Sequence, residues 1–225
     1  MNSTNSTTNF HTIIFVVFRK TPYDWQTAVG TEILSAVEKK QRIHTLCVRP
    51  TGGGKTLLFT TTAASLKGIT LCIMPLLSLG ADQVKKLIAN TTGNKSIITG
   101  FHLDDIPSNH LDELINLMKN YNPLKTVIIF ASPQSLLKER SPVLPYLISD
   151  ECKLSMVVID EIHLVTHFGL SFRKEFCDLK DVLLRKIRGK KVPLLFLTAT
   201  CTNCMKVSLK AMFSIKINHV HWLIA

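Results

Sequence analysis

The sequence contains no hydrophobic run long enough to cross a membrane. The apolar stretch nearest the N-terminus covers only residues 13–18, and no basic segment precedes it. A membrane span needs about 20 apolar residues and a secretion signal needs a basic start, so both are excluded there. The chain also lacks low-complexity tracts and internal repeats. We therefore expect an intracellular globular protein, nuclear or cytoplasmic, with no membrane partner.

Cysteines are few and scattered, without the spacing of a disulfide framework. This favours a reducing compartment and free thiols. Cys201 and Cys204 form a CxxC pair, but structural zinc needs four ligands, and His219 and His221 lie far downstream. A metal site at this pair is therefore not expected.

Acidic residues are also scarce, with 16 Asp and Glu against 27 Lys and Arg, which gives a formal net charge of +11. Such a balance favours polyanionic partners, with nucleic acid first and an anionic membrane surface second. A basic but unspecialised surface is the remaining alternative.

The hydrophobic pattern alternates between helices and strands. Trp25, Val29, Ile33 and Val37 have helical spacing, and short apolar runs at 45–48, 68–74, 96–101, 126–131, 154–160 and 192–200 predict strands. Helices are expected at 55–66 and 78–90, around 111–118, and along 172–187. The pattern predicts an α/β three-layer sandwich with a mainly parallel sheet. We expect a disordered tail at 1–20, one α/β lobe at 21–213 and a C-terminal tail at 214–225.

A phosphate-binding loop is predicted between the strand at 45–48 and the helix at 55–66. Gly52, Gly53 and Gly54 would let backbone N–H groups turn toward phosphate oxygens, at the positive end of the helix. Lys55 would reach the β- and γ-phosphates of ATP, and the Thr56 hydroxyl would hold Mg²⁺. Arg49 stands where the P-loop pattern has its first glycine.

Two acidic residues follow the apolar strand at 154–160. Asp160 would bind Mg²⁺, and Glu161 is placed to act as general base toward an attacking water. Taken alone, the pair would indicate a solvated helix start. Together with the Lys55–Thr56 loop, it predicts a nucleotide site.

These motifs resemble, in order, those of superfamily 2 helicases, and specifically the RecQ family. "RPTGGGKT" is similar to the family's ATP-binding motif and adds Thr51 to the nucleotide site. By the same resemblance, "IMPLLSLGADQV" brings Pro75 and Ser78 to DNA, and "ASPQSLL" brings Ser132 and Pro133. "DEIH" resembles the DEAH box, and "LTAT" resembles the motif in which Thr198 and Thr200 couple nucleotide state to the lobes. The resemblance implies a P-loop NTPase (RecA-like) helicase lobe.

The segment after the box, "HLVTHFGLSFRKEF", is similar to the aromatic-rich loop of RecQ enzymes. The resemblance implies that Phe168, Phe172 and Arg173 contact single-stranded DNA, and that His163 links this loop to the phosphate site. Aromatic rings and arginine stack on unpaired bases. Phe172 also falls on the apolar stripe of a helix, so a core position is the alternative. Gln26 resembles the family's adenine-binding glutamine; its alternative is a solvated residue near a helix start.

The resemblance further implies ATP and Mg²⁺ as cofactors, and single-stranded or forked DNA as partner, with RNA as an alternative and 3′–5′ polarity. In that family a second lobe supplies an arginine to the ATP site, in cis or in trans. The 25 residues after Thr200 are too few for such a lobe. A truncated helicase, a stand-alone lobe and a degenerate relic therefore stay open. We expect nucleotide binding with weak or no ATP hydrolysis, and no unwinding by this chain alone. The alternative function is a nucleotide-dependent nucleic-acid-binding module without turnover.

Overall fold

The computed structural model describes residues 3–74, 82–87, 97–120, 122, 124–139, 141–167 and 170–222. A seven-stranded sheet has the strand order β3-β4-β2-β5-β6-β1-β7. Every pairing among these described strands is parallel. The strands are β1 (His44–Val48), β2 (Gly68–Ile73), β3 (Ile98–His102), β4 (Thr126–Ala131), β5 (Leu154–Ile159), β6 (Leu194–Thr198) and β7 (His219–His221). The predicted α/β fold with a parallel sheet is confirmed.

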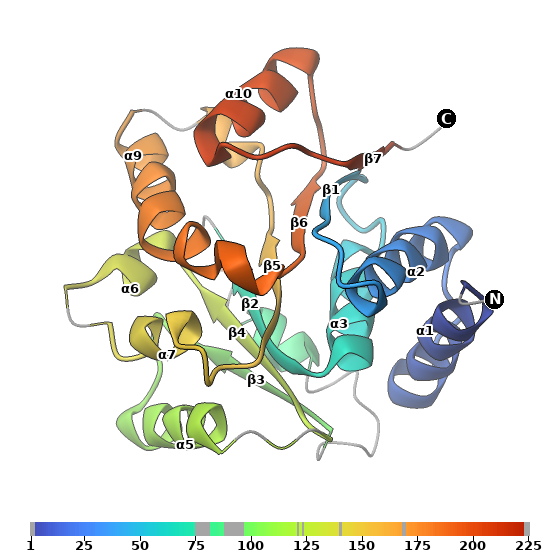
Figure 1. Cartoon of the computed structure of the whole chain (residues 1–225), viewed down its shortest axis with the longest axis horizontal. Coiled ribbons are helices and arrows are strands. Elements are labelled where there is room, and N and C mark those ends of the chain that lie inside the picture. Colours follow the sequence, from blue (N-terminus) through green and yellow to red (C-terminus); the bar gives the residue numbers. More distant parts are fainter. Residues whose placement is uncertain are drawn as a thin grey trace.

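Helices cover both faces of this sheet (Figure 1). On one face lie α1 (Ser3–Phe18), α2 (Asp24–Glu38) and α3 (Lys55–Leu66). On the other lie α5 (Ser108–Lys119), α6 (Pro133–Leu137), α7 (Leu144–Ile148), α9 (Leu170–Leu179) and α10 (Asn203–Phe213). The short helix α8 (Leu164–His167) precedes α9, and residues 82–87 are also helical.

Central strands are apolar throughout because both of their faces are covered. Each residue of β2 and β4 is buried, whereas the edge strands β3 and β7 are partly exposed. Successive residues of a strand point to opposite faces, so Leu46 packs into the core beneath α9 and α10, and Cys47 packs into the core beneath α1, α2 and α3. The sheet is thus the middle layer of three.

Helix α1 corrects the expectation of a disordered N-terminal tail. Phe10, Ile14, Val17 and Phe18 are spaced along one helical face and are buried against the core that α2 and α3 share. The contact between α1 and α2 is close at Gly30, where an added Cβ would lie 2.2 Å from the Phe10 ring. The polar residues before Phe10 suggested disorder, but the apolar stripe binds the segment to the lobe.

The C-terminal segment also differs from the expected tail. β7 pairs in parallel with β1 and closes that edge of the sheet. His219 and His221 point to α2, where Nδ1 of His219 lies 2.5 Å and Nε2 of His221 lies 2.6 Å from the Glu32 carboxylate. The lobe therefore extends past the expected boundary at residue 213.

The helix expected along 172–187 is interrupted. α9 ends at Leu179 and is followed by a π-helical turn, η1 (Lys180–Leu184), and a 3₁₀ turn, η2 (Lys186–Lys190). The change of period keeps Leu183 and Ile187 buried. Within the described residues, no helix has the length and hydrophobicity to span a membrane. The same residues contain no cluster of three possible metal ligands at Cys201 and Cys204 or elsewhere that could hold an ion.

Candidate nucleotide-binding site

The glycine-rich loop connects β1 to α3 at the carboxyl edge of the sheet, where parallel α/β folds bind ligands. Gly52 and Gly54 have φ angles of +78° and +86°, which side chains rarely adopt. At Gly54 an added Cβ would also lie 2.6 Å from Gln26 Nε2. The loop therefore needs glycine at both positions for conformation, and at Gly54 for space as well.

Lys55 is the first residue of α3, and its side chain folds back over the loop. Its Nζ donates to the carbonyl oxygens of Arg49 at 3.0 Å and Pro50 at 3.2 Å, and lies 3.8 Å from Glu161 Oε1. The residue is only 7% exposed. A buried ammonium at a helix N-terminus makes this end of the loop strongly electropositive. Thr56, next along α3, also lines the cavity.

Asp160 follows β5 and faces the loop across the cavity. Its Oδ1 accepts a hydrogen bond from the Glu161 backbone N–H at 2.9 Å. The pKa of Asp160 is raised to about 6, first by burial and then by the neighbouring Glu161 carboxylate. The positive charge of Lys55 lowers the same pKa, by a smaller amount. A buried carboxylate held beside another carboxylate is a suitable ligand for a divalent cation.

Glu161 connects the loop to the end of β6. Its backbone lies in the left-handed region at φ +46°, a conformation that costs energy for a non-glycine residue. Oε2 is buried and lies 3.3 Å from His163 Nδ1, which in turn lies 3.1 Å from Thr198 Oγ1. The Thr198 hydroxyl donates to the carbonyl of Thr200 at 2.7 Å. A continuous polar path thus joins the acidic pair to Thr198 and Thr200.

Gln26 is fully buried and braces the loop. Its Nε2 donates to the Gly54 carbonyl at 2.9 Å, and its Oε1 accepts the Tyr23 N–H at 2.8 Å. This excludes the alternative of a solvated residue at a helix start. In this structure both ends of the amide are bonded to the protein, so adenine recognition by Gln26 remains a hypothesis.

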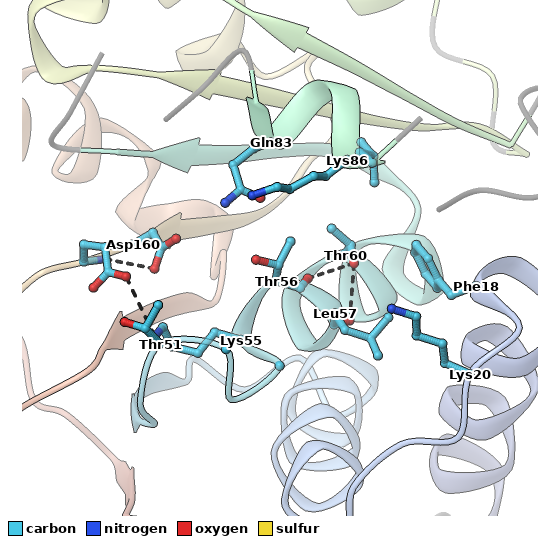
Figure 2. Close-up of a pocket in the computed structure, with 14 residues that line it drawn as sticks. Phe18, Lys20, Thr51, Lys55, Thr56, Leu57, Thr60, Gln83, Lys86 and Asp160 are labelled. Carbon is cyan, nitrogen blue, oxygen red and sulfur yellow. Dashed lines mark hydrogen bonds and ion pairs between the residues drawn. The ribbon is translucent and has the colours of Figure 1, made fainter. Parts of the chain in front are cut away.

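The cavity between these elements has a volume of about 350 Å³ (Figure 2). The loop residues Thr51, Gly52, Gly54, Lys55 and Thr56 line it together with Asp160 and Glu161. Gly53 lies in the same loop, where its N–H donates to the Pro50 carbonyl at 3.0 Å. Cations at the loop and carboxylates across from them suit a nucleotide phosphate and Mg²⁺, so the residues fit both groups.

Seven residues that the sequence analysis did not assign to this cavity also line it, among them Leu57 and Thr60 of α3 and Leu87. Phe18 and Lys20 come from the end of α1 and the segment after it, and Gln83 and Lys86 come from the helix at 82–87 (Figure 2). Phe18 and Lys20 were missed because the N-terminal segment was expected to be disordered. The helical spacing of Phe10, Ile14 and Phe18 was the signal that could have placed them.

Residues 24–207 match the family of DEAD/DEAH box helicases. The chain belongs to this family. The match covers the loop, the Asp160–Glu161 pair and the Thr198–Thr200 segment. The RecQ-like first helicase lobe that the sequence predicted is therefore confirmed at the level of the family. Similarity to curated RecQ-type helicases supports its RecQ character.

The chain is 33% identical over 159 residues to "ATP-dependent DNA helicase Q-like 4B" of Arabidopsis thaliana, covering 70% of the chain and 13% of that protein. It is 29% identical over 177 residues to "ATP-dependent DNA helicase RecQ" of Pasteurella multocida, covering 78% of the chain and 26% of that protein. The chain thus spans about a quarter or less of the length of these two relatives.

Solved helicase structures share the fold at low identity. The Hef helicase domain of Pyrococcus furiosus matches 89% of the chain and 38% of that structure, with a TM-score of 0.57 and 18% identity. The DUF1998 helicase MrfA matches 95% of the chain and 32% of that structure, with a TM-score of 0.62 and 16% identity. These similarities support the fold of a helicase lobe.

In this RecQ-like lobe, five of the seven residues expected to contact nucleic acid lie wholly or partly outside the described part of the chain. Pro75, Ser78 and Phe168 lie outside the residues that the structure describes. Phe172 and Arg173 are in α9, and their side chains also lie outside the described part.

The remaining two expected contacts, Ser132 and Pro133, are buried at the start of α6. The Ser132 side chain accepts the Ser135 N–H at 3.1 Å and donates to the Asp104 carboxylate. Asp104 also accepts the Ser132 N–H at 2.9 Å. These bonds fix the turn after β4, so a DNA contact by Ser132 itself remains a hypothesis.

Proposed function

We propose that the chain is the first motor lobe of an ATP-dependent DNA helicase of the RecQ type. The observation that carries the proposal is the meeting of Lys55, Asp160 and Glu161 around one cavity, with a polar path from Glu161 to Thr198. The sequence relatives, which are named DNA helicases, support DNA as the nucleic acid. An intracellular location and 3′–5′ polarity belong to the same proposal.

Each residue of the site has a proposed role. The loop N–H groups and Lys55 bind the β- and γ-phosphates of ATP, because they form a cationic cradle at the N-terminus of α3. Thr56 and Asp160 hold Mg²⁺, which neutralises charge on the phosphates when it is bound. Glu161 orients the attacking water and accepts its proton, since Oε2 accepts no hydrogen bond within the described residues.

The path from Glu161 through His163 to Thr198 is proposed to couple the ATP site to DNA. His163 begins the segment that leads to α8 and α9, where the aromatic loop is expected to contact single-stranded or forked DNA. A shift of this segment would move His163 relative to the Glu161 carboxylate, 3.3 Å away. DNA binding would thereby change the ability of Glu161 to accept a proton.

A second helicase lobe, in cis or in trans, is proposed to complete the ATP site. The family that the chain resembles uses an arginine from that lobe, and such a residue contributes about 10³ to 10⁵ in rate. The isolated 225-residue chain should therefore bind nucleotide and hydrolyse it slowly, without unwinding DNA.

The test is ATP hydrolysis by the purified chain with and without single-stranded DNA, beside Glu161→Gln and the control Glu113→Gln. Glu113 is an exposed carboxylate on α5, remote from the cavity. We expect slow, DNA-stimulated hydrolysis that Glu161→Gln abolishes and Glu113→Gln retains. Nucleotide binding without any hydrolysis, also after addition of a second lobe, would favour the binding module without turnover.

A further inference from the structure

A second group of cationic side chains lies at the amino edge of the sheet, at the opposite ends of the strands from the nucleotide site. Arg42 precedes β1, Arg188 lies in η2, and Lys216 precedes β7. With His44, Ser214, Ile215 and Asn218 they line a hollow of about 320 Å³. β1 is five residues long, so this hollow is about 16 Å from the phosphate loop along the strand.

Among the residues that the structure describes, the three cations of this hollow have no acidic partner. Within the described part of the chain, Arg42, Arg188 and Lys216 form no ion pair with a carboxylate. Arg188 Nη2 makes only a long contact of 3.5 Å with the Ser214 carbonyl. Burial lowers the pKa of Arg42, and the nearby positive charge of Arg188 lowers it further. Like charges held together without compensation indicate a site for an anion.

His44 provides an independent indication of a ligand. The residue lines the hollow and is only 4% exposed, yet its Nδ1 has no hydrogen-bond partner. Burial first, and then Arg42, lower the pKa of His44 to about 4, while an interaction with the Ile43 backbone acts in the opposite direction, so the imidazole is neutral near pH 7. A neutral imidazole has one N–H donor and one acceptor, and a buried nitrogen left unpaired costs free energy. An oxygen of a bound anion would satisfy the donor.

The positive charge continues beyond this hollow. On the other side of η2, Lys40, Lys153, Lys190 and Lys191 line a second hollow of about 410 Å³. Lys190 is partly compensated there, because its Nζ donates to the Ser149 carbonyl and lies 3.9 Å from Asp150. Two cationic hollows on either side of one short segment match a ligand with repeated negative charges better than a single small anion.

We propose that these two hollows form a nucleic-acid-binding surface, the amino-edge surface, which contacts the phosphodiester backbone of DNA. Arg42, Arg188 and Lys216 hold one phosphate, His44 donates to one of its oxygens, and the lysines of the second hollow hold phosphates further along the strand. Arginine forms bidentate hydrogen bonds with phosphate, which suits the paired guanidinium groups. This surface acts independently of the nucleotide site, so it adds a DNA contact to the proposed motor function and does not rest on it.

The test measures binding of a short fluorescently labelled DNA duplex to the 225-residue chain without nucleotide, over a series of salt concentrations. The variant is Arg188→Gln, and the matched control is Lys210→Gln, which removes one exposed positive charge on α10. Arg188→Gln should weaken binding about fivefold. It should also lower the slope of log affinity against log salt by about 0.9. Lys210→Gln should change neither quantity appreciably.

Further binding measurements distinguish DNA from other polyanions as the ligand of this surface. Equal losses of DNA affinity in Arg188→Gln and Lys210→Gln would show that net charge alone determines binding, and they would overturn the proposal. Arg188-dependent binding of tripolyphosphate, or of a polyglutamate peptide, without Arg188-dependent binding of DNA would also overturn it. Lys55→Ala changes the phosphate loop and its contacts at the opposite ends of the strands, so it should leave the Arg188-dependent part of DNA binding unchanged. Failure of the nucleotide site and failure of the amino-edge surface are thereby distinguished.

Discussion

Replacing the buried Asp160 carboxylate by the neutral amide of asparagine is expected to stabilise the ligand-free lobe and to abolish its response to Mg²⁺. The pKa of Asp160 rises from its ordinary value of 3.8 to about 6, first because of burial and then because of Glu161. A raised pKa in the folded chain means that the folded state binds the proton more tightly than the unfolded state. Proton binding to Asp160 therefore stabilises the folded lobe fully below about pH 3.8, and this stabilisation is lost as the pH rises through about 6.

The magnitude follows from the size of the shift. From 3.8 to about 6 is roughly two pKa units, which costs the folded lobe about 3 kcal/mol at pH 8. Asparagine removes this cost and keeps an oxygen that can accept the Glu161 N–H. For a chain of this size, the melting temperature should rise by about 6–12 °C at pH 8. Near pH 5, where Asp160 is largely protonated in the folded chain, the gain should shrink to about half.

Urea unfolding of the two proteins at about pH 8 and pH 5 measures the difference, with Asp112→Asn on the exposed side of α5 as control. The parent chain should gain stability from Mg²⁺ with a non-hydrolysable ATP analogue, and Asp160→Asn should not gain the Mg²⁺-dependent part. A gain in the free energy of unfolding that is the same at pH 8 and pH 5 would refute the raised pKa of Asp160 as its cause. Loss of stability in Asp160→Asn at pH 8 would refute the burial cost itself.

Three other substitutions test the loop and its coupling. Lys55→Ala should abolish binding of a fluorescent nucleotide while the circular dichroism spectrum stays unchanged; retained affinity would contradict the phosphate-site assignment. Gly54→Ala should lower the free energy of unfolding by about 1–3 kcal/mol in urea titrations, because of the positive φ and the clash with Gln26. A second change, Gln26→Ala, should recover part of that loss. Thr198→Val removes the hydroxyl that contacts His163, so DNA stimulation of ATP hydrolysis should fall while nucleotide affinity, measured by titration, stays the same.

The elements that form the proposed ATP site were predictable because local sequence determines them. The strands β2, β4 and β5 are continuous apolar runs, and such runs mark strands covered on both faces. Helix α3 begins at Lys55 directly after the glycines, as predicted from the loop pattern. Asp160 follows a buried strand, so its position at the carboxyl edge followed from the topology.

The contacts that the sequence did not predict depend on tertiary structure. α1 contains many Ser, Thr and Asn residues, which favour other conformations, and its apolar stripe is stabilised only against α2 and α3. The hydrogen bond from Gln26 to Gly54 joins residues 28 positions apart and needs the fold to bring them together. The orphaned nitrogen of His44 is likewise visible only once β1 and the segment before β7 are packed.

Arg49 explains how the phosphate loop tolerates the loss of the first glycine of its pattern. Among the residues of this loop, the positive φ angles belong to Gly52 and Gly54, so the position of Arg49 needs no glycine. Its side chain points away from the cradle: Nη1 donates to the Val48 carbonyl at 2.8 Å and to the His221 carbonyl at 3.3 Å.

The Arg49 guanidinium also stacks over the Trp25 ring, 4.7 Å from its centroid, while Lys55 Nζ bonds to the Arg49 carbonyl. One residue thus links α2 and β7 to the backbone that holds Lys55. Displacing β7 or truncating Trp25 would therefore act on the proposed ATP site without touching the nucleotide. A glycine at position 49 would keep the cradle and lose these links.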